Sequence, residues 1–334
     1  MKALVYTGIQ ELIYREEKNP KEIIGESIIK VLASGICGSD MHAYHGRDER
    51  RNAPLILGHE VSGVIQNGKL KNQTVVLNPL ITCNVCNYCK NGREHLCPKR
   101  TMVGMSEPAL REGGLAEFIS IPDKNIYVIP KTLDTNESAL TEPTAVCVHA
   151  VSLSKESSKK PLSECKVLVQ GCGAIGLLCG LILSKKEHCK EIVMSDPNNL
   201  RLEECTKYLN AKFVNPTHKE LNESVFDIVF DTVGLEVSRQ QAIHTIVPGG
   251  IIVHVGLTQP DGKFNFRKLT IQEITVVGTY CYTNKDFEEA IDILNKKKLG
   301  SLNWIEYREL KKGANAFKEI HEGTCIAPKI ILIP

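Results

Sequence analysis

The stretch that decides the fold is residues 166–196, KVLVQGCGAIGLLCGLILSKKEHCKEIVMSD. Its apolar run at 166–171 predicts a strand, residues 174–186 predict a helix, and residues 191–196 predict a second strand. Strands that alternate with helices at this spacing are typical of βαβ units, in which neighbouring strands are parallel. The stretch therefore predicts a parallel sheet covered by helices.

The turn between the first strand and the helix, GCGAIG, carries spaced glycines. A G-x-G-x-x-G turn that follows a strand and opens a helix is typical of a dinucleotide site, because glycine permits the tight turn and lets the backbone approach a pyrophosphate. The helix N-terminus adds amide donors and the positive end of a dipole. The residues expected to contact the cofactor are Gly171, Gly173, Ala174, Ile175, Gly176, Asp196, Arg201, Val255 and Gly256.

Asp196 favours NAD over NADP as the cofactor. It lies twenty residues after Gly176, at the end of the next predicted strand. A carboxylate there can accept both hydroxyls of the adenosine ribose and would repel the extra phosphate of NADP. Arg201 could stack on adenine, or bind that phosphate if Asp196 were misassigned. The alternative is that Asp196 only caps the following helix, which SDPNNL also fits.

Outward from this stretch the chain divides into two regions. After it, a helix is predicted at 198–210 and strands at 211–216, 226–234, 249–256 and 274–280, which together predict a doubly wound parallel sheet. Before residue 164, short apolar runs separated by Gly, Asn and Pro predict a β-rich lobe. An amphipathic helix is predicted at 286–299, and we expect the tail from residue 301 to pack back on the first lobe.

Length and composition limit the possible classes of protein. A chain of 334 residues suggests two domains, and a formal charge of +2 argues against nucleic acid or an anionic membrane as partner. Residues 167–184 are long enough to span a membrane, but Gln170 and several glycines favour strand, turn and helix. The N-terminus, MKALVYTGIQ, lacks the apolar run of a secretory signal, and thirteen cysteines, an odd number, indicate a reducing cytoplasm.

Four cysteines in the 83–97 loop form the pattern C-x2-C-x2-C-x7-C. The residues between them are mostly polar, so these thiols are poor candidates for core packing. Four thiolates on one loop suit a closed tetrahedral zinc site that stabilises the fold, although an iron–sulfur cluster could use the same ligands. The predicted ligands are Cys83, Cys86, Cys89 and Cys97.

A second possible metal site is dispersed over Cys37, His59, Glu60 and Glu142. One thiolate, one imidazole and one carboxylate would leave zinc an open position, as catalytic sites require. Spacing alone makes this weak evidence. Cys37 could be a small buried apolar residue and His59 an ordinary loop residue.

The order of five motifs strengthens this interpretation. GICGSDMHAYHG, LILGHEVSGVI, the cysteine loop, LTEPTAVCVHA and VQGCGAIG follow one another as in zinc-dependent medium-chain dehydrogenases. The chain resembles this family over essentially its whole length, and most closely its sorbitol- and galactitol-dehydrogenase-like polyol branch. The resemblance implies an α/β fold with a GroES-like β-rich catalytic domain at residues 1–147 and 283–334. It places a doubly wound Rossmann domain at residues 148–282.

The resemblance also implies two zinc ions per chain, one catalytic and one structural, and NAD. It assigns the catalytic zinc to Cys37, His59 and Glu142, with Glu60 as an outer or exchanging ligand. In the polyol branch the residue matching Glu60 can itself bind zinc while the one matching Glu142 holds the zinc water, so both carboxylates remain candidates. It further assigns proton transfer to Ser39 and His42, although Ser39 could also cap a short helix.

The implied reaction transfers a hydride from the secondary alcohol of a small polyol to NAD and gives a ketone. Tyr44 and His45 are candidate pocket residues. An alternative is a sugar-acid or sugar-phosphate substrate held by Arg47, Arg50, Arg51 and Arg111, although residues 47–51 read more simply as a solvated loop of mixed charge. A further alternative is a regulatory protein that binds NAD and zinc without catalysis.

Three smaller expectations concern single residues and assembly. Cys147 is expected in the core rather than as a ligand. His95, inside the cysteine loop, could compete as a ligand but is expected to point outward. The resemblance suggests a homo-oligomer, a dimer or tetramer, assembled through the sheet edge near residues 270–282.

Overall fold

The predicted strand–turn–helix–strand stretch is the centre of a six-stranded parallel sheet in the computed structural model, which describes residues 1–219 and 221–334. Val167 of the first strand pairs with Ile192 of the second. The sheet order is β13-β12-β11-β14-β15-β16, so the chain starts in the middle and winds outward both ways. The strands are β11 (Lys166–Gln170), β12 (Glu191–Ser195), β13 (Lys212–Val214), β14 (Phe226–Asp231), β15 (Ile246–His254) and β16 (Thr275–Gly278).

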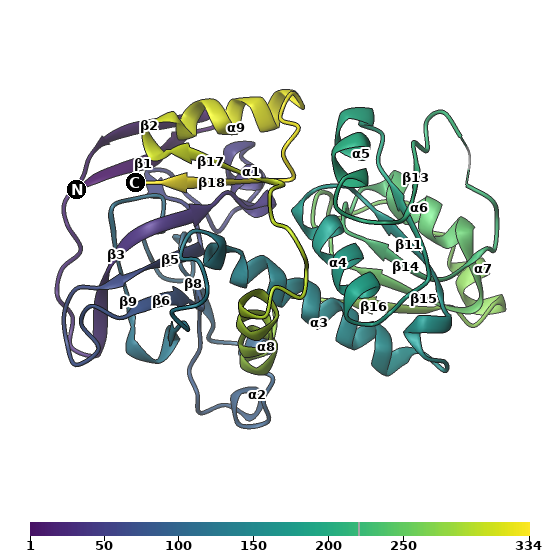
Figure 1. Cartoon of the computed structure of the whole chain (residues 1–334), viewed down its shortest axis with the longest axis horizontal. Helices are drawn as coiled ribbons and strands as arrows, with labels where there is room; N and C mark the ends of the chain where they lie inside the picture. Colours follow the sequence, from purple (N-terminus) through teal and green to yellow (C-terminus); the bar gives the residue numbers. More distant parts are fainter. Residues whose placement is uncertain (220) are drawn as a thin grey trace.

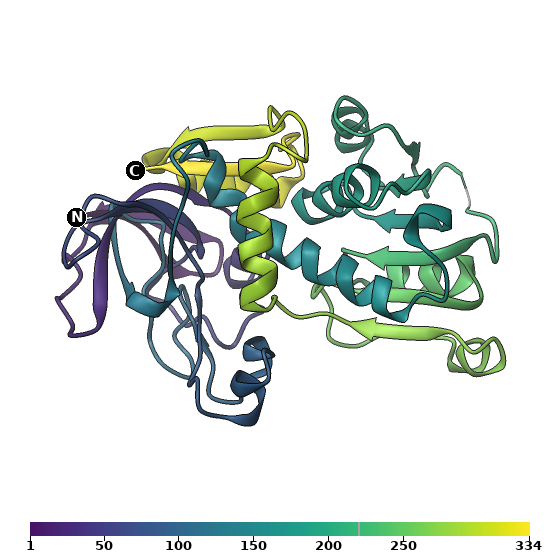
Figure 2. The ribbon, with the colours of Figure 1, turned by 60° about the horizontal axis from the view of Figure 1, so that its bottom comes forward.

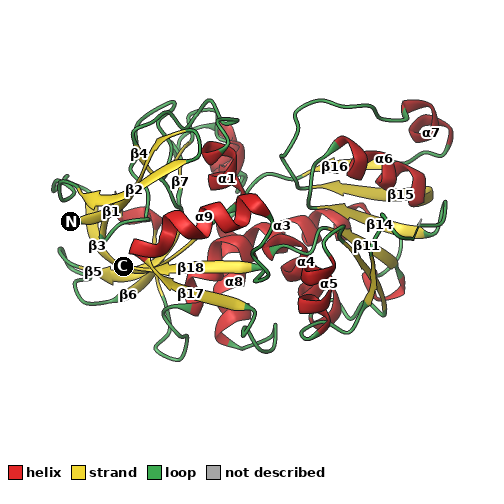
Figure 3. Cartoon of the chain, turned by 90° about the horizontal axis from the view of Figure 1, so that it is seen from above, coloured by secondary structure: helices red, strands yellow, loops and turns green. Residues whose placement is uncertain are grey.

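Helices cover both faces of this sheet (Figure 3). In β11 the side chains alternate: Val167 and Val169 pack in the core that includes the helix after the glycine turn, whereas Leu168 packs with Ala242 and Ile243 on the opposite face. The fold class predicted from the sequence is therefore confirmed. The helices are α3 (Thr141–Ser157), α4 (Ala174–Lys185), α5 (Asn199–Thr206), α6 (Glu236–Thr245), α7 (Phe266–Ile271) and α8 (Asn284–Asn295). Among the described residues, no helix is long and apolar enough to cross a membrane.

The other lobe is β-rich and contains both ends of the chain (Figure 1). Its larger sheet has the order β10-β6-β5-β3-β18-β17, with β9 paired to β3, and its smaller sheet has the order β2-β1-β4. The strands are β1 (Lys2–Gly8), β2 (Glu11–Glu16), β3 (Glu26–Gly35), β4 (Leu55–Ile56), β5 (Glu60–Ile65), β6 (Thr74–Leu77), β7 (Leu80–Ile81), β8 (Thr101–Met102), β9 (Phe118–Pro122), β10 (Ile126–Val128), β17 (Ile305–Glu309) and β18 (Lys329–Ile333). The short helices α1 (Gly38–Tyr44) and α2 (Asn87–Lys90) and the longer α9 (Gly313–Glu322) complete it.

The C-terminal tail returns to the first lobe, as expected. β18 pairs antiparallel with β3, so that Ile331 lies opposite Gly35. Residues almost three hundred positions apart thereby become neighbours in one sheet. This return places the end of the chain beside the dispersed candidate metal site.

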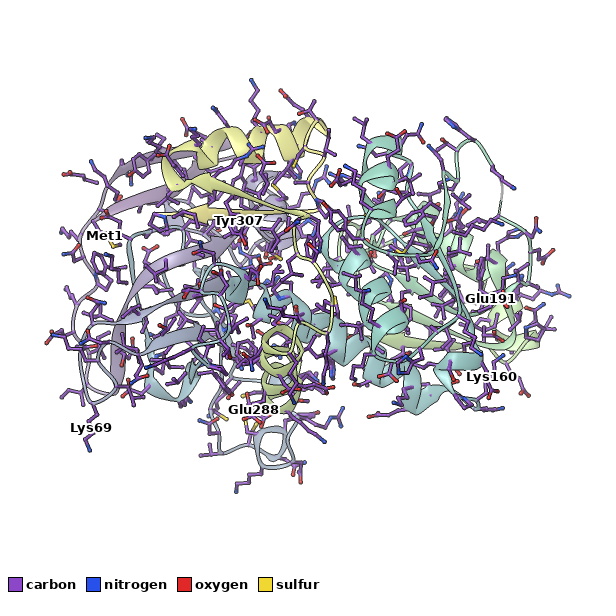
Figure 4. All side chains as sticks on the ribbon, viewed as in Figure 1. Met1, Lys69, Lys160, Glu191, Glu288 and Tyr307 are labelled. Atoms are coloured by element: carbon purple, nitrogen blue, oxygen red, sulfur yellow. The ribbon has the colours of Figure 1, made fainter. Side chains whose placement is uncertain are left out.

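Helices α3 and α8 lie between the β-rich lobe and the parallel sheet (Figure 2). His149 of α3 contacts Asp286 of α8, with 2.9 Å between Nδ1 and Oδ2. Thr283 and Asp286 cap each other's backbone at the start of α8, which explains why this helix begins before the predicted residue 286. Side chains of both lobes reach into the seam between them (Figure 4).

Helix α3 is the largest element that the sequence analysis missed. Eleven of its seventeen residues are buried, so it carries no polar face from which a helical period could be read. The helix predicted at 198–210 is also shorter in the structure, where α5 ends at Thr206.

Candidate metal and cofactor site

The pairing of β3 with β5 brings Cys37, His59 and Glu60 together. Gly35, at the end of β3, lies opposite Glu60, the first residue of β5. Cys37 follows two residues later and His59 directly precedes β5, and one ligand atom from each of the three residues lies within 4.8 Å of the others. A Cβ atom at Gly35 would lie 1.9 Å from Oε2 of Glu60, so glycine makes the space for this carboxylate.

A buried carboxylate orients the His59 ring. Oδ1 of Asp40 lies 3.5 Å from Nδ1 of His59, and both side chains are buried. Burial raises the pKa of Asp40, but His59 and Arg51 outweigh this effect and hold it at about 2. An ionised partner on Nδ1 leaves Nε2 available as a metal ligand, which is the usual arrangement around a metal-binding histidine.

Glu60 has a charged partner that the sequence analysis missed. Nζ of Lys329, in β18, donates to Oε1 of Glu60 at 2.6 Å and to the carbonyl of Ile36 at 2.8 Å. Burial lowers the pKa of Lys329, but Glu60 and Cys37 raise it above the usual value, so the pair is ionic. Lys329 begins the otherwise apolar stretch KIILI, and this charged residue at the start of a buried strand was the signal that could have identified it.

Glu142 lies near this cluster but outside the group of three. It is the second residue of α3, is 5% exposed, and lines the same cavity as Cys37 and His59. Burial raises its pKa to about 7, with a further contribution from Glu60 and an opposing one from His59. The geometry thus groups Glu60, rather than Glu142, with Cys37 and His59.

The four loop cysteines also converge. Their Sγ atoms lie within 4.8 Å of one another, with 3.5 Å between Cys86 and Cys89 and 3.5 Å between Cys83 and Cys97. Four sulfurs around zinc at about 2.3 Å in a tetrahedron are about 3.8 Å apart. Backbone amides of Val85 and Cys86 lower the pKa of the Cys83 thiol, which favours the thiolate that binds metal. The loop therefore fits a zinc ion.

The glycine turn opens on a cavity of about 380 Å³ that reaches the dispersed cluster. Gly171 has φ +97°, and a Cβ at Gly176 would lie 1.9 Å from the carbonyl oxygen of Gly171, so both positions require glycine. At Gly173 a Cβ would meet nothing within 4 Å, which leaves room for a ligand. The predicted cofactor residues that line this cavity are Gly171, Gly173, Ala174, Ile175, Gly176, Asp196 and Arg201.

Asp196 is held by the backbone of the glycine turn. Its Oδ2 accepts from the amide of Cys172 at 2.8 Å and its Oδ1 accepts from the amide of Asn198 at 2.8 Å. The side chain is thus fixed at the carboxyl end of β12, where it lines the cavity. The helix α5 is capped by Asn198 rather than by Asp196, so the alternative of a simple helix cap does not describe this residue.

A second cavity of about 400 Å³ adjoins the first and is lined by several further predicted site residues. Ser39 lies between the buried Arg51 and the metal cluster: its Oγ accepts from Nη2 of Arg51 at 3.2 Å and lies 3.4 Å from Nε2 of His59. Burial lowers the pKa of His42, and Arg51 lowers it further. The predicted residues that line this cavity are Cys37, Ser39, His42, His45, His59, Glu142, Val255 and Gly256.

Several expectations about individual side chains were wrong. Tyr44 does not line either of the two cavities and packs in the core against Phe317, with 5.7 Å between ring centroids. His95 does not point outward: it is 5% exposed and its ring lies 4.8 Å from that of His149. Arg111 pairs with Glu26 at 2.6 Å, away from the cavities.

The interpretation of residues 47–51 as a solvated loop was wrong for Arg51. This side chain is 2% exposed and donates to Ser39 and to the carbonyl of Gly104. Cys147, in contrast, is a core residue as expected, fully buried with its thiol directed at the carbonyl of Ile175.

Known proteins match almost the whole chain. The family "Alcohol dehydrogenase GroES-like domain" matches residues 24–131, and the family "Zinc-binding dehydrogenase" matches residues 174–296. The chain is 30% identical over 348 residues to the probable D-xylulose reductase A of Aspergillus fumigatus, which covers 96% of this chain and 94% of that protein. It is 29% identical over 322 residues to the L-galactonate-5-dehydrogenase of Escherichia coli, with 92% and 91% covered. The crystal structure of galactitol-1-phosphate dehydrogenase from Escherichia coli matches with a TM-score of 0.86, at 25% identity over 100% of both chains.

Proposed function

Since this chain belongs to the zinc-dependent medium-chain alcohol and polyol dehydrogenase family, we propose that it oxidises the secondary alcohol of a polyol to a ketone and reduces NAD. The observation that carries the proposal is the meeting of two sites. The cavity of the glycine turn and the cavity of the Cys37–His59–Glu60 cluster share Ile175, Thr232 and Val233 in their walls. A nicotinamide ring held in the first cavity and an alcohol held in the second would therefore meet at this shared wall.

In this proposal Cys37, His59 and Glu60 hold the catalytic zinc, with Glu142 as the exchanging carboxylate. Bound zinc would act as a Lewis acid on the alcohol oxygen, and NAD would accept the hydride. Lys329 neutralises the buried charge of Glu60 and keeps its carboxylate against Gly35. The four loop cysteines hold a second zinc ion that stabilises the fold.

The proton of the alcohol leaves through Ser39 and His42. Because Arg51 donates to Oγ of Ser39, the hydroxyl hydrogen of Ser39 is free to point elsewhere. His42 lines the same cavity, and its lowered pKa keeps the imidazole neutral near pH 7, so that it can accept a proton. Asp196 supports NAD as the cofactor because its carboxylate lines the cavity of the glycine turn directly after β12, where an acidic residue can accept both ribose hydroxyls and repel the extra phosphate of NADP.

The test is the appearance of NADH in the presence of the zinc-loaded protein, NAD and a panel of alcohols. The panel contains polyols, aldonates, sugar phosphates, small diols and primary alcohols, each with and without a zinc chelator. We expect chelator-sensitive oxidation of secondary alcohols. Absence of turnover across the panel, with zinc and NAD both bound, would instead support a binding protein without catalysis.

The proposal extends to assembly and compartment. Phe266 and Ile271 are each 69% exposed, and Val276 on the edge strand β16 is 44% exposed, which supports a dimer or tetramer formed through this edge. All thirteen cysteines lie within the described residues and none of them forms a disulfide, which supports a reducing cytoplasm. A monomer mass in light scattering would contradict the proposed assembly.

A further inference from the structure

A basic loop borders the cavity that contains the candidate catalytic zinc site. Arg47, Arg50 and Arg51 all line this cavity of about 400 Å³, together with Cys37 and His59. The one acidic residue that lines it is Glu142, which is buried beside the metal cluster and lies outside the arginine loop. The mouth of the cavity therefore carries positive charge that the oxidation of a neutral alcohol does not use.

The loop keeps an excess of positive charge after its internal ion pairs are counted. Asp48 pairs with Arg50, with 2.9 Å between Oδ1 and Nε, and also with Arg51. Arg47 has no ion-pair partner among the residues that the structure describes, and Glu49, on the same loop, has none there either. Three guanidiniums and these two carboxylates leave one net positive charge, and Glu49 does not line the cavity.

The three arginines differ in burial and in hydrogen-bond partners. Arg51 is buried, and its donors are used by Asp48, Ser39 and the carbonyl of Gly104. Arg50 is 45% exposed, and its Nε and Nη2 donate to Asp48 at 2.9 and 3.1 Å, which leaves Nη1 for a molecule in the cavity. Arg47 is exposed and lines the cavity without an ion-pair partner among the described residues, so its whole guanidinium is available there. His42, the residue proposed to accept the proton, lines the same cavity as the three arginines.

Part of the cavity wall is apolar. Met41, Met102 and Met105 also line it and offer no partner for an anion. Two cations that remain half solvated beside an apolar wall gain most from a ligand that brings its own negative charge. A planar guanidinium matches a carboxylate or phosphate through two parallel hydrogen bonds.

We propose that Arg47 and Arg50 bind the anionic end of the substrate, a carboxylate or a phosphate, while its secondary alcohol lies at the Cys37–His59–Glu60 cluster. This inference rests on the proposed function and narrows it. The substrate is an aldonate or a polyol phosphate rather than a neutral polyol. Arg51 positions Ser39 and does not itself contact the anion.

The first experiment compares kcat/KM for matched six-carbon substrates with the zinc-loaded protein and NAD. A polyol, the aldonate of the same configuration and the polyol phosphate of the same configuration form the set. One of the two anionic substrates is expected to exceed the neutral polyol by about 10- to 100-fold, the range that a hydrogen bond to a charged group supplies. The better anion identifies carboxylate or phosphate as the natural group. A polyol that matches or exceeds both anions overturns the inference and leaves the proposed function in place.

Substitutions of Arg47 and Arg50 test whether these side chains cause the preference for an anionic substrate. In Arg47→Gln and Arg50→Gln the ratio of kcat/KM for the anionic substrate to that for the polyol should fall about 10-fold or more, mainly through KM. Lys69→Gln is the control that also removes one exposed positive charge, because Lys69 is exposed between β5 and β6 and does not line this cavity. An unchanged ratio in both cavity variants contradicts the assignment.

A binding measurement separates this inference from the proposed function. Inorganic phosphate and a six-carbon aldonate are titrated by calorimetry into the zinc-loaded protein with NADH present. Binding to the wild type and to Lys69→Gln that is weakened at least 10-fold in Arg47→Gln supports the anion site even if no alcohol is oxidised. Absence of binding of both anions to the wild type overturns it.

Discussion

The two candidate metal clusters of this molecule are built in opposite ways. The cysteine loop takes all four ligands from fifteen consecutive residues, three of its cysteines are partly exposed, and no charged side chain is paired to them among the described residues. The Cys37–His59–Glu60 cluster takes its ligands from the ends of two strands, is mostly buried, and is surrounded by Asp40, Lys329 and Gly35. The first is a local feature of sequence, whereas the second exists only because the sheet has formed.

This difference predicts which cluster loses its ligand geometry when the metal is removed. The loop has only a short helix, α2, and a 3₁₀ turn to hold its thiols, so the metal supplies much of its order. The dispersed cluster is held by strand pairing and by ion pairs, so it should keep its geometry when the metal is removed. Four substitutions, one in the cysteine loop and three in or beside the dispersed cluster, should separate the two clusters by activity, stability and zinc content.

The largest effect is expected from Cys37→Ala, which removes a ligand of the dispersed cluster. Activity should fall by more than about 1000-fold, because a metal that polarises the reacting oxygen contributes several kcal/mol. Zinc content should fall from two ions per chain to one, and the unfolding midpoint of the metal-free protein should change little. Retained activity with one zinc ion per chain would contradict the assignment of Cys37.

Cys86→Ser should lower stability and leave the zinc ion of the dispersed cluster in place. Loss of the loop metal should lower the free energy of unfolding by about 4 kcal/mol, as expected when a structural metal is lost. Protease cleavage within residues 84–96 should become faster, while the dispersed cluster keeps its zinc. Loss of both zinc ions, with cleavage spread over the whole chain, would show that the loop is not an independent unit.

Lys329→Met tests how much the ion pair between Lys329 and Glu60 stabilises the dispersed cluster. It leaves the Glu60 carboxylate buried without its partner, and the metal-free protein should lose about 3–5 kcal/mol of stability in urea denaturation. The double variant Glu60→Gln/Lys329→Met should recover most of this loss, because no uncompensated charge remains. Equal loss in the single and double variants would mean that Lys329 acts through packing alone.

Asp40→Asn should give the smallest effect. The amide cannot supply the negative charge that orients His59, so the affinity of this cluster for zinc should fall by about 10- to 100-fold, as found for outer partners of metal ligands. Competition with a chelator measures the two sites separately. The affinity of the loop site should not change, and it therefore serves as the internal control in the same molecule.

The local features of the molecule could be predicted from sequence. The glycine turn, the strands on either side of it and the cysteine loop are each defined by residues close together in the chain, so spacing was sufficient. Helix α3 could not be recognised, because burial on nearly all sides removes the polar face that marks a helix. The dispersed cluster was proposed only through resemblance to a family, since its residues share no local pattern.

The functional environment of that cluster depended on tertiary structure. Residues 47–51 look like a solvated charged loop, yet Arg51 is buried against Ser39 while Arg47 and Arg50 face the cavity. Lys329 reaches Glu60 across 269 residues of sequence because β18 pairs with β3. The parallel sheet, the dinucleotide turn and the cysteine loop follow from local sequence patterns, because these features rest on residues close together in the chain. Only the folded chain decided which charges are paired, buried or left facing the substrate, because those properties arise between residues that are distant in sequence.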